Sequence, residues 1–444
     1  MKINASLTPQ QLLRKLPRFW ELSDAKIHRI EKSYDSTKGS PVFTVRGKYT
    51  ARGWTDWTQG FQYGSAIVQR DATDGTFPEH LRNKIVAVMT PHVSHFGVHD
   101  HGFNNVSTFG NLLRLMNEGR IPENLWERNT YELALKLSGA VQARRWTKTA
   151  DGGGFIYSFN GPHSLFVDSL RSLRSLAVAH KLGHVLTEEN DRKVSLFDRL
   201  KQHAVAVAKY NVRPDGQVAH EAIFNANDGN FRCLNSQQGW SPFTTWTRGL
   251  AWAMLGFAEQ LEFFHGIVGA DSIRDRSRLQ TAPTVATMLK AAKATCDFYI
   301  EHATAADGIP YWDTGAPQLH KLGDWQGKPA NPFNDFEPVD SSAAAIAAQG
   351  LLRLGHYLKN KRYWQAGLTV LDTLLDEPYL GADAKHQGLI LHSIYHRPNG
   401  WDFVPRGRKI PRGESSMWGD YHAREAALYI QRIARGERYL TFWS

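Results

Sequence analysis

Apolar residues recur at helical spacing along most of the chain, and this pattern predicts about a dozen helices. The first is expected over 8–22, and the second follows the aromatic segment 54–61 and ends near Arg70. The others are expected at 79–89, 103–118, 123–143, 164–182, 192–210, 246–266, 283–303, 340–358, 361–375 and 418–435. Strand signals are scarce, and 38–53 is expected to form a loop or a short hairpin.

Long loops separate these helices at about every second joint. They are expected at 92–102, 146–163, 212–245, 305–339 and 395–417. Tight and long joints in alternation predict an all-α fold of six helical hairpins closed in a ring. This is an (α/α)6 barrel, with its long loops gathered over one mouth. An open helical array is the alternative, although no strict sequence period indicates a solenoid. No Pro/Gly/Ser-rich linker divides the chain, so 1–444 is expected to be one domain.

Composition narrows the class of partner. The net charge of +10 makes nucleic acid the first partner to consider, but Lys and Arg are scattered and form no basic stripe, so we expect no nucleic-acid partner. A basic surface without a specific partner explains the charge, and an anionic small substrate is the second explanation. The two cysteines, Cys233 and Cys296, give neither a disulfide framework nor a metal-ligand cluster. No apolar run approaches the roughly 18 residues that span a bilayer. The first dozen residues lack a secretion-signal pattern, so we expect the cytoplasm, or the periplasm where a signal peptide has been removed.

The stretch 238–257 joins a polar, aromatic loop to an expected helix. Arg248 and Trp252 lie four positions apart near the start of that helix, so their side chains share one face. Amides at a helix start favour anions, and a guanidinium beside an indole suits a flat ligand that carries a carboxylate. The alternative is structural, with Trp252 in the core and Arg248 paired with a carboxylate of the protein.

Asp100 lies between two histidines just ahead of an expected helix. A helix N-cap explains an aspartate at this position, but it does not explain why both neighbours, His99 and His101, are histidines. The two flanking histidines could alternatively have no functional meaning and be there by chance. Because the two histidines are not at the four-residue spacing of helical metal ligands, the pattern argues against a metal site.

A second carboxylate, Asp168, lies inside an apolar run near a helix start. Burial raises the pKa of a carboxyl, and a carboxyl that exchanges a proton near neutrality suits general acid–base catalysis. A structural pairing with Arg171, Arg174 or a backbone amide is the alternative. A barrel could bring Asp100 and Asp168 to one mouth, and two carboxylates whose pKa values are driven apart are a recurrent acid–base arrangement.

Six segments, in order along the chain, resemble motifs of the unsaturated glucuronyl hydrolases of glycoside hydrolase family 88. They are W-T-Q-G-F at 57–61, H-D-H-G-F at 99–103, V-D-S-L at 167–170, R-G-L-A-W at 248–252, D-S-S-A-A-A at 340–345 and W-G-D-Y at 418–421. The resemblance spans about 54–430, which is most of the chain. Two departures are Leu250, where the family usually has glutamine, and Phe159, where it has tryptophan.

The resemblance implies an (α/α)6 barrel and a specific reaction. Such an enzyme releases a Δ4,5-unsaturated uronic acid from the non-reducing end of oligosaccharides made by polysaccharide lyases. It protonates C4 of the enol ether and adds water at C5, and the hemiketal then collapses. The alternatives are an unsaturated rhamnogalacturonyl hydrolase of the family 105 type and a barrel that binds acidic glycans without catalysis.

Matched residue by residue, the resemblance makes Asp168 the general acid–base and Asp100 the second carboxylate, and places Arg248 against the uronate carboxylate or a nearby anionic group. The substrate contacts that it implies are Trp57, His99, His220, Gln238, Arg248 and Trp252. We expect no metal and no organic cofactor, because neither a ligand cluster nor a glycine-rich phosphate loop is present. The expected partner is a small anionic oligosaccharide, and the sequence indicates no oligomeric state. The basic loop 395–417 is expected to shape the aglycone side, or alternatively to be a solvated surface.

Overall fold

The structure is a computed structural model. It describes residues 1–53, 56–270 and 275–443, and the side chains of these residues except those of 56 and 268–280. Trp54 and Thr55, which open the expected aromatic segment at 54–61, lie outside this range.

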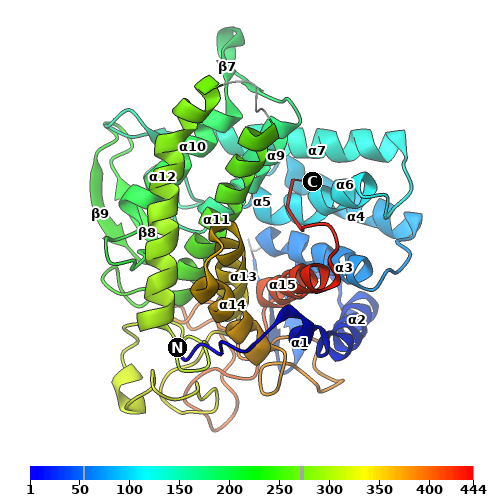
Figure 1. The fold of residues 1–444 in the computed structure, drawn as a ribbon, viewed down its shortest axis with the longest axis vertical. Coiled ribbons are helices and arrows are strands. Elements are labelled where there is room, and N and C mark those ends of the chain that lie inside the picture. Colours follow the sequence, from blue (N-terminus) through cyan, green and yellow to red (C-terminus); the bar gives the residue numbers. More distant parts are fainter. Residues whose placement is uncertain (54–55, 271–274, 444) are drawn as a thin grey trace.

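The helices of an inner ring are buried on nearly every face (Figure 1). Its members are α3 (Gln59–Ala72), α5 (His101–Asn104) with α6 (Asn111–Asn117), α8 (Ser169–Ser172) with α9 (Arg174–Lys181), α11 (Thr247–Ala270), α13 (Ser341–Leu358) and α15 (Met417–Arg435). Each member packs against the next, and α15 packs back against α3. The last helix of the chain therefore closes the ring onto the first inner helix.

An outer layer of amphipathic helices surrounds this ring. It consists of α2 (Leu16–Ser33), α4 (Glu79–Val93), α7 (Leu125–Arg144), α10 (Leu196–Tyr210), α12 (Asp275–Phe298) and α14 (Lys361–Leu374), with the short α1 (Pro9–Leu13) ahead of them. Each outer helix buries one face and precedes an inner segment along the chain. Within the described residues this makes six outer–inner hairpins, which confirms the predicted (α/α)6 barrel.

Short antiparallel sheets lie in the connections between helices. β1 (Phe43–Val45) and β2 (Lys48–Thr50) form the hairpin that was one of the two expectations for 38–53. The other strands are β3 (Trp146–Lys148) with β4 (Gly154–Ile156), β6 (Leu186–Thr187) with β7 (Lys193–Val194), and the three-stranded order of β5 (Ser164–Phe166), β8 (Glu221–Phe224) and β9 (Phe231–Asn235).

The expectation of one helix over 164–182 is wrong at its start. Ser164, Leu165 and Phe166 form β5, and helical structure begins only at α8. All three residues of β5 are buried because β8 pairs with them, with Leu165 opposite Ala222. A strand buried on both faces has no alternating pattern, and a short apolar run of this kind is indistinguishable by periodicity from a helix.

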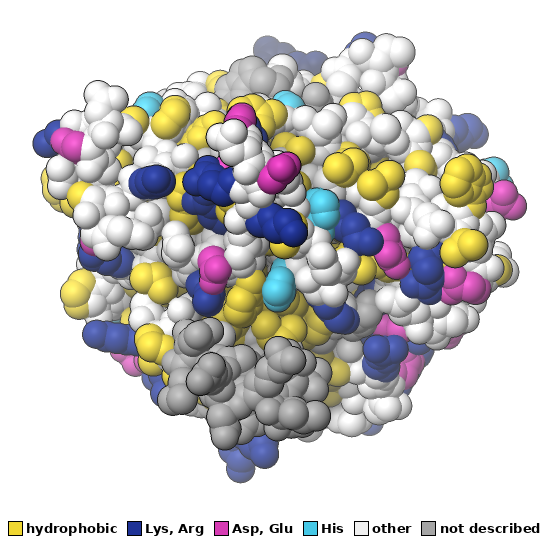
Figure 2. Space-filling view, turned by 90° about the horizontal axis from the view of Figure 1, so that it is seen from above, with side chains coloured by type: hydrophobic (Ala, Val, Ile, Leu, Met, Phe, Trp, Pro, Cys, Tyr) yellow, Lys and Arg dark blue, Asp and Glu magenta, His cyan; other side chains and the backbone are white. Residues whose placement is uncertain are grey.

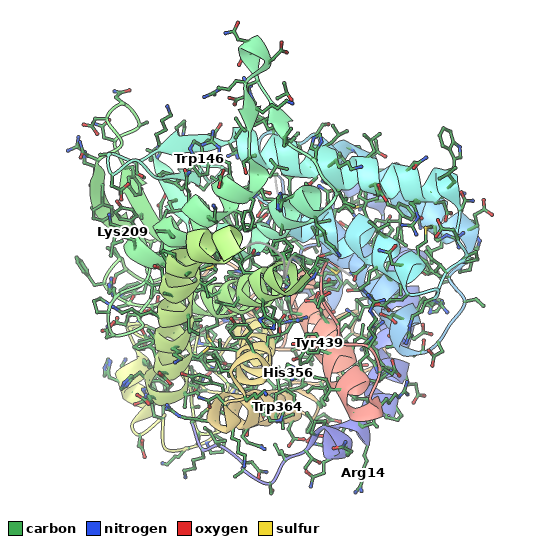
Figure 3. The ribbon with its side chains drawn as sticks, turned by 45° about the horizontal axis from the view of Figure 1, so that its top comes forward. Arg14, Trp146, Lys209, His356, Trp364 and Tyr439 are labelled. Atoms are coloured by element: carbon green, nitrogen blue, oxygen red, sulfur yellow. The ribbon has the colours of Figure 1, made fainter. Side chains whose placement is uncertain are left out.

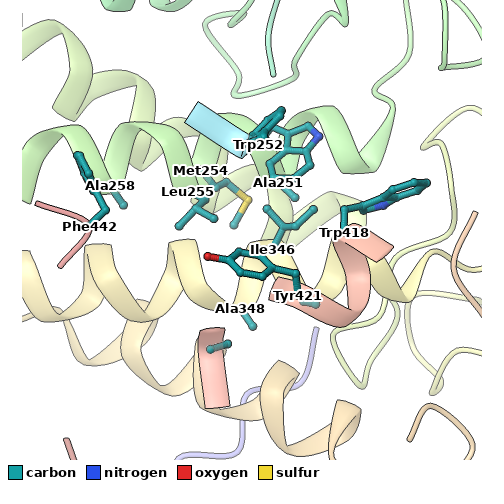
Figure 4. Packing of buried hydrophobic residues seen from close by; sticks show 14 of the residues in the cluster. Ala251, Trp252, Met254, Leu255, Ala258, Ile346, Ala348, Trp418, Tyr421 and Phe442 are labelled. Carbon is teal, nitrogen blue, oxygen red and sulfur yellow. The ribbon is translucent and has the colours of Figure 1, made fainter. Parts of the chain in front are cut away.

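The core is densest where α11, α13 and α15 meet (Figure 4). Trp252 and Met254 of α11 pack there with Ile346 of α13 and Tyr421 of α15, and all four are buried. Burial of each large apolar side chain stabilises the fold by about 1.5–3 kcal/mol. Gly350 sets the spacing of two helices, since a Cβ there would lie 2.9 Å from the Leu255 nitrogen of α11.

The C-terminal tail packs over these inner helices. Tyr439 stacks on His356 of α13, with ring centroids 4.8 Å apart, and its hydroxyl lies 2.7 Å from that of Tyr429 of α15 (Figure 3). Within the described part of the chain, no helix is both long and apolar enough to cross a membrane.

Candidate active site

Loops and helix starts enclose a cavity of about 430 Å³. Seven of the eight predicted site residues line it: Trp57, His99, Asp100, Asp168, Gln238, Arg248 and Trp252. These residues are up to 195 positions apart in the sequence and meet only because the inner ring closes. His220, the eighth, lies behind the wall.

Asp100 and Asp168 come together because α5 and α8 approach closely. A Cβ at Gly102 of α5 would lie 2.3 Å from the carbonyl oxygen of Ser172, so only glycine fits there. The Gly102 amide instead donates to Ser172 Oγ at 2.9 Å. Both aspartates occupy the N-cap position of their helices, yet neither makes a side-chain capping hydrogen bond. Asp100 is therefore at an N-cap position, as the cap explanation expects, but its carboxylate does not cap the helix.

His99 lies between the two carboxylates. Its Nε2 is 3.1 Å from Asp168 Oδ1 and 3.6 Å from Asp100 Oδ1. Burial would lower the pKa of the His99 imidazole, but Asp100 and Asp168 together outweigh burial and raise that pKa above its ordinary value. The ring is held between Phe159 and Phe166, at centroid distances of 6.1 and 5.6 Å. His99 is thus a cationic bridge between two buried acids.

The pKa values of the two acids are driven apart, because only Asp168 is hydrogen-bonded to His99. Burial raises the pKa of Asp100 to about 6, with the negative charge of Asp168 adding to the effect. Burial also acts on Asp168, but the hydrogen-bonded His99 outweighs it and leaves the pKa of Asp168 below its ordinary value. The expectation that burial raises the pKa of Asp168 is therefore wrong for the ligand-free site. Asp100 is therefore the carboxyl that holds a proton at mildly acidic pH and loses it as the pH rises through about 6.

His101, the other neighbour of Asp100, serves the scaffold. Its Nδ1 lies 3.0 Å from Ser138 Oγ and its Nε2 lies 3.0 Å from the His95 carbonyl oxygen. Burial lowers the pKa of His101 to about 4, so the ring is neutral at physiological pH.

Arg248 forms an internal clamp rather than an open anion site. Its Nη1 donates to Asp340 Oδ2 at 2.9 Å and to the Ile394 carbonyl. Its Nη2 donates to Gln238 Oε1 at 2.9 Å and to the Tyr395 carbonyl at 2.6 Å. With four donors engaged within the protein, Arg248 makes the structural ion pair of the alternative interpretation, with Asp340. Its contact with an anionic group of a substrate stays a prediction. Its charge still borders the cavity.

Trp57 and Trp252 are walls of the cavity supported by the core. Trp57 stacks on Trp418, with centroids 5.2 Å apart and planes at 26°. Trp252 is buried and packs against Phe103 at 4.9 Å. Trp252 is therefore both a core residue, as the structural alternative has it, and part of the cavity wall.

His220 fixes the segment that carries Gln238. Its Nδ1 accepts hydrogen bonds from the backbone amides of Gln237 at 3.0 Å and Gln238 at 3.3 Å. Burial lowers the pKa of His220 to about 4, so Nδ1 is free to accept. The ring packs on Phe166 and Trp246 at 4.3 and 4.8 Å. His220 holds this segment in place but does not itself line the cavity, and its contact with a substrate stays a prediction.

Several lining residues escaped the sequence reasoning. They are His95, Gly97, Val98, Phe103, Gln237, Trp246, Tyr395, His396 and Trp401, with Phe159 noted only as a departure. Tyr395, His396 and Trp401 belong to the loop 395–417. The sequence prediction for this loop considered its basic residues and not its aromatic ones. Asp402 fixes this loop by accepting from the amides of Tyr395 and His396 at 2.5 and 3.0 Å.

Among the described residues, no group of three or more His, Cys, Asp or Glu side chains is placed to hold a metal ion.

Fold and site together define a helical-barrel protein with an acid–base centre in an aromatic cavity. The chain is 26% identical over 380 residues to an unsaturated glucuronyl hydrolase of Formosa agariphila, covering 85% of this chain and 80% of that one. It is 26% identical over 410 residues to an unsaturated glucuronyl hydrolase of Bacillus sp. (strain GL1), covering 88% and 90%. No protein-family model matches.

Solved structures agree on the fold. An unsaturated glucuronyl hydrolase specific for heparin superposes with a TM-score of 0.71 at 20% identity, covering 95% of this chain and 98% of that one. The enzyme from Bacillus sp. GL1 gives 0.68 at 22% identity, covering 94% and 97%. The chain is therefore similar to unsaturated glucuronyl hydrolases over most of its length, in agreement with the resemblance of its six motif segments.

Proposed function

We propose that the protein is a glycoside hydrolase that releases a Δ4,5-unsaturated uronic acid from the non-reducing end of small anionic oligosaccharides. The observation that carries the proposal is the pair of buried carboxylates, Asp100 and Asp168, bridged by His99 within an aromatic cavity. The names of the similar proteins support it. A further similar structure, from Streptococcus agalactiae, is a complex with dGlcA-GalNAc6S.

Hydration of the enol ether needs one group that gives and then takes a proton. Asp168 donates a proton to C4, and the electrons of the C4–C5 double bond form the new C–H bond. The cation at C5 is stabilised by the ring oxygen. Water adds at C5 and returns a proton to Asp168. The C5 hemiketal opens, which leaves a hemiacetal at C1 that expels the aglycone, so one water is consumed in each turnover.

Asp168 must first be protonated, and the site holds a nearby proton source. In the ligand-free cavity Asp168 is the ionised acid, whereas the pKa of Asp100 is raised to about 6. A bound uronate adds negative charge and favours protonation of both acids. Because His99 Nε2 lies within 3.6 Å of both carboxylates, it can pass the proton of Asp100 to Asp168. Activity is then expected to fall as the pH rises above about 6.

We propose further that residues 1–444 are one catalytic domain. The ring is completed by α15 packing on α3, so the two ends of the chain contribute to the same barrel. The cavity is lined from Trp57 to Trp401, and no shorter segment of the chain contains it.

A panel of unsaturated disaccharides from chondroitin, heparin and pectin tests the activity, with the loss of ultraviolet absorbance of the double bond as the readout. We expect turnover of the glucuronate-derived substrates by the natural sequence, and binding without turnover by Asp168→Asn. Preference for the pectin product would favour the rhamnogalacturonyl alternative. Tight binding with no turnover across the panel would instead make the protein a glycan-binding barrel.

A further inference from the structure

An open groove of about 930 Å³ lies beside α2, roughly twice the size of the 430 Å³ catalytic cavity. We call it the basic groove, because its lining includes His28, Arg29, Lys32, Lys38, Lys48 and Lys385 against a single acid, Asp35. On the face seen in Figure 2, by contrast, Lys and Arg are intermixed with acidic and apolar side chains. Positive charge gathered around one concave surface therefore needs its own explanation.

Most of this charge is not neutralised by the protein. Lys38 lies 3.8 Å from Asp35, and His28 lies 3.2 Å from Asp24. Within the described part of the chain, four exposed cations of the groove make no ion pair: Arg29, Lys32, Lys48 and Lys385. Like charges around one groove repel each other, and an anionic ligand would relieve that repulsion.

The walls of the basic groove are tied to one another. Gln387 accepts from the Tyr49 amide at 2.6 Å and donates through Nε2 to Ser33 Oγ at 2.8 Å. One side chain thus joins the strand β2, the end of α2 and the 385–387 segment. The Tyr49 hydroxyl donates to Asp420 Oδ2 of α15 at 2.9 Å, which anchors the floor to the barrel. A groove that is formed before its ligand arrives binds at a lower entropic cost.

The chain leads directly from this groove to the catalytic cavity. Ala51 lines the basic groove, and the next residue, Arg52, places its guanidinium 4.4 Å from the ring centroid of Trp401. Trp401 lines the cavity. The basic groove and the cavity are therefore adjacent, separated along the chain by a single residue.

We propose that the basic groove binds a linear polysaccharide that carries carboxylate or sulfate groups. The choice of partner rests on the proposed function, since the reaction consumes fragments of such polymers. Nucleic acid is less suited, because single strands need exposed rings on which bases stack. Of the two aromatic residues in the lining, Tyr49 is buried and Tyr34 is half-buried, with its hydroxyl donating to the Gly39 carbonyl.

The test compares two variants with the same loss of four charges. The groove variant combines Arg29→Gln, Lys32→Gln, Lys48→Gln and Lys385→Gln, and the control combines Lys193→Gln, Lys290→Gln, Lys293→Gln and Lys361→Gln. Affinity is measured at low salt for immobilised chondroitin sulfate and for polygalacturonate, which separates sulfate from carboxylate recognition, and for single-stranded and duplex DNA. We expect the groove variant to bind at least one of the polysaccharides about tenfold more weakly and the control to bind like the natural sequence.

Equal weakening of the two variants would overturn the proposal, as would failure of the natural sequence to bind either polysaccharide. Tighter binding to DNA that is lost only in the groove variant would assign the groove to nucleic acid instead. Turnover of unsaturated disaccharides should be unchanged in both variants, which also reports that they fold. If the natural sequence turns over no unsaturated disaccharide, the proposed function is wrong. The comparison of polysaccharide binding between the two variants still tests the basic groove independently of that result.

Discussion

Replacement of Asp100 by asparagine should stabilise the protein while it impairs the reaction. The carboxyl is buried, lies 3.6 Å from the His99 ring and faces Asp168 as a like charge and Arg145 as an opposite one. Asparagine has nearly the same shape and cannot ionise. The variant therefore removes the cost of a buried negative charge and keeps the packing.

The magnitude follows from the pKa of Asp100, which is about 6 in the folded protein against 3.8 for an ordinary aspartate. That difference corresponds to about 3 kcal/mol of folding free energy. A raised pKa means that the folded state binds the proton more tightly than the unfolded chain does. The associated stability is complete below pH 3.8 and is lost as the pH rises to about 6. The gain of Asp100→Asn over the natural sequence should therefore grow between these pH values and then stay constant.

Thermal unfolding at several pH values between 4 and 8 measures this gain. For a chain of 444 residues, about 3 kcal/mol corresponds to a rise in Tm of about 3 °C. Burial also raises the pKa of Asp402 to about 6, so the pH dependence of Tm in the natural sequence includes an effect of Asp402 as well as that of Asp100. The difference in Tm between the variant and the natural sequence is therefore the quantity to plot against pH. Asp191→Asn, at an exposed turn, is the matched control. A difference in Tm that stays flat from pH 4 to 8 would refute the reasoning.

Three further measurements test the site, the first of them on the same Asp100→Asn variant and the other two on new variants. Asp100→Asn should lower kcat by about 10²–10⁴-fold, because the proton source is removed, and a kcat within twofold of the natural value would contradict the relay. In Arg248→Lys, the lysine side chain cannot reach the four acceptors around the guanidinium, and buried Asp340 is left poorly paired. The free energy of unfolding, measured with denaturant, should fall by about 3 kcal/mol. An unchanged midpoint of unfolding would count against the clamp. Trp401→Ala should raise KM about tenfold at nearly constant kcat in steady-state assays, since it removes a wall of the cavity and not an acid. A fall in kcat with KM unchanged would show that Trp401 acts in the chemical step.

The barrel could be predicted from the sequence because helical periodicity is a local signal and the long loops fall at regular joints. The strand β5 could not, because its partner β8 lies about sixty residues further along the chain, with Ser164 opposite Ile223. Its apolar residues are consistent with a helix until that pairing is known. This difference matters for function, because β5 ends two residues before Asp168 and therefore fixes the backbone position of that residue.

The site residues could be predicted as a set, but their charges could not. Burial of Asp168 is visible in the sequence as an apolar run, whereas the contact that reverses its effect comes from His99, 69 positions earlier. That contact exists only because Gly102 allows α5 to approach α8. The role of Arg248 was undecided for the same reason, since its partner Asp340 lies 92 positions away.

Three aspartates in this barrel stand at the starts of inner helices, and their hydrogen bonds separate their roles. Asp340 accepts from the amides of Ser342 and Ala343 and from Arg248, so its carboxylate is fully used in holding the fold. Asp100 and Asp168 occupy the same position in their helices but make no capping bond, and both carboxylates turn instead to one histidine in the cavity. The sequence does not show which of the three carboxylates makes capping hydrogen bonds. Because neither makes a capping bond, the carboxylates of Asp100 and Asp168 are free for the acid–base roles proposed for them.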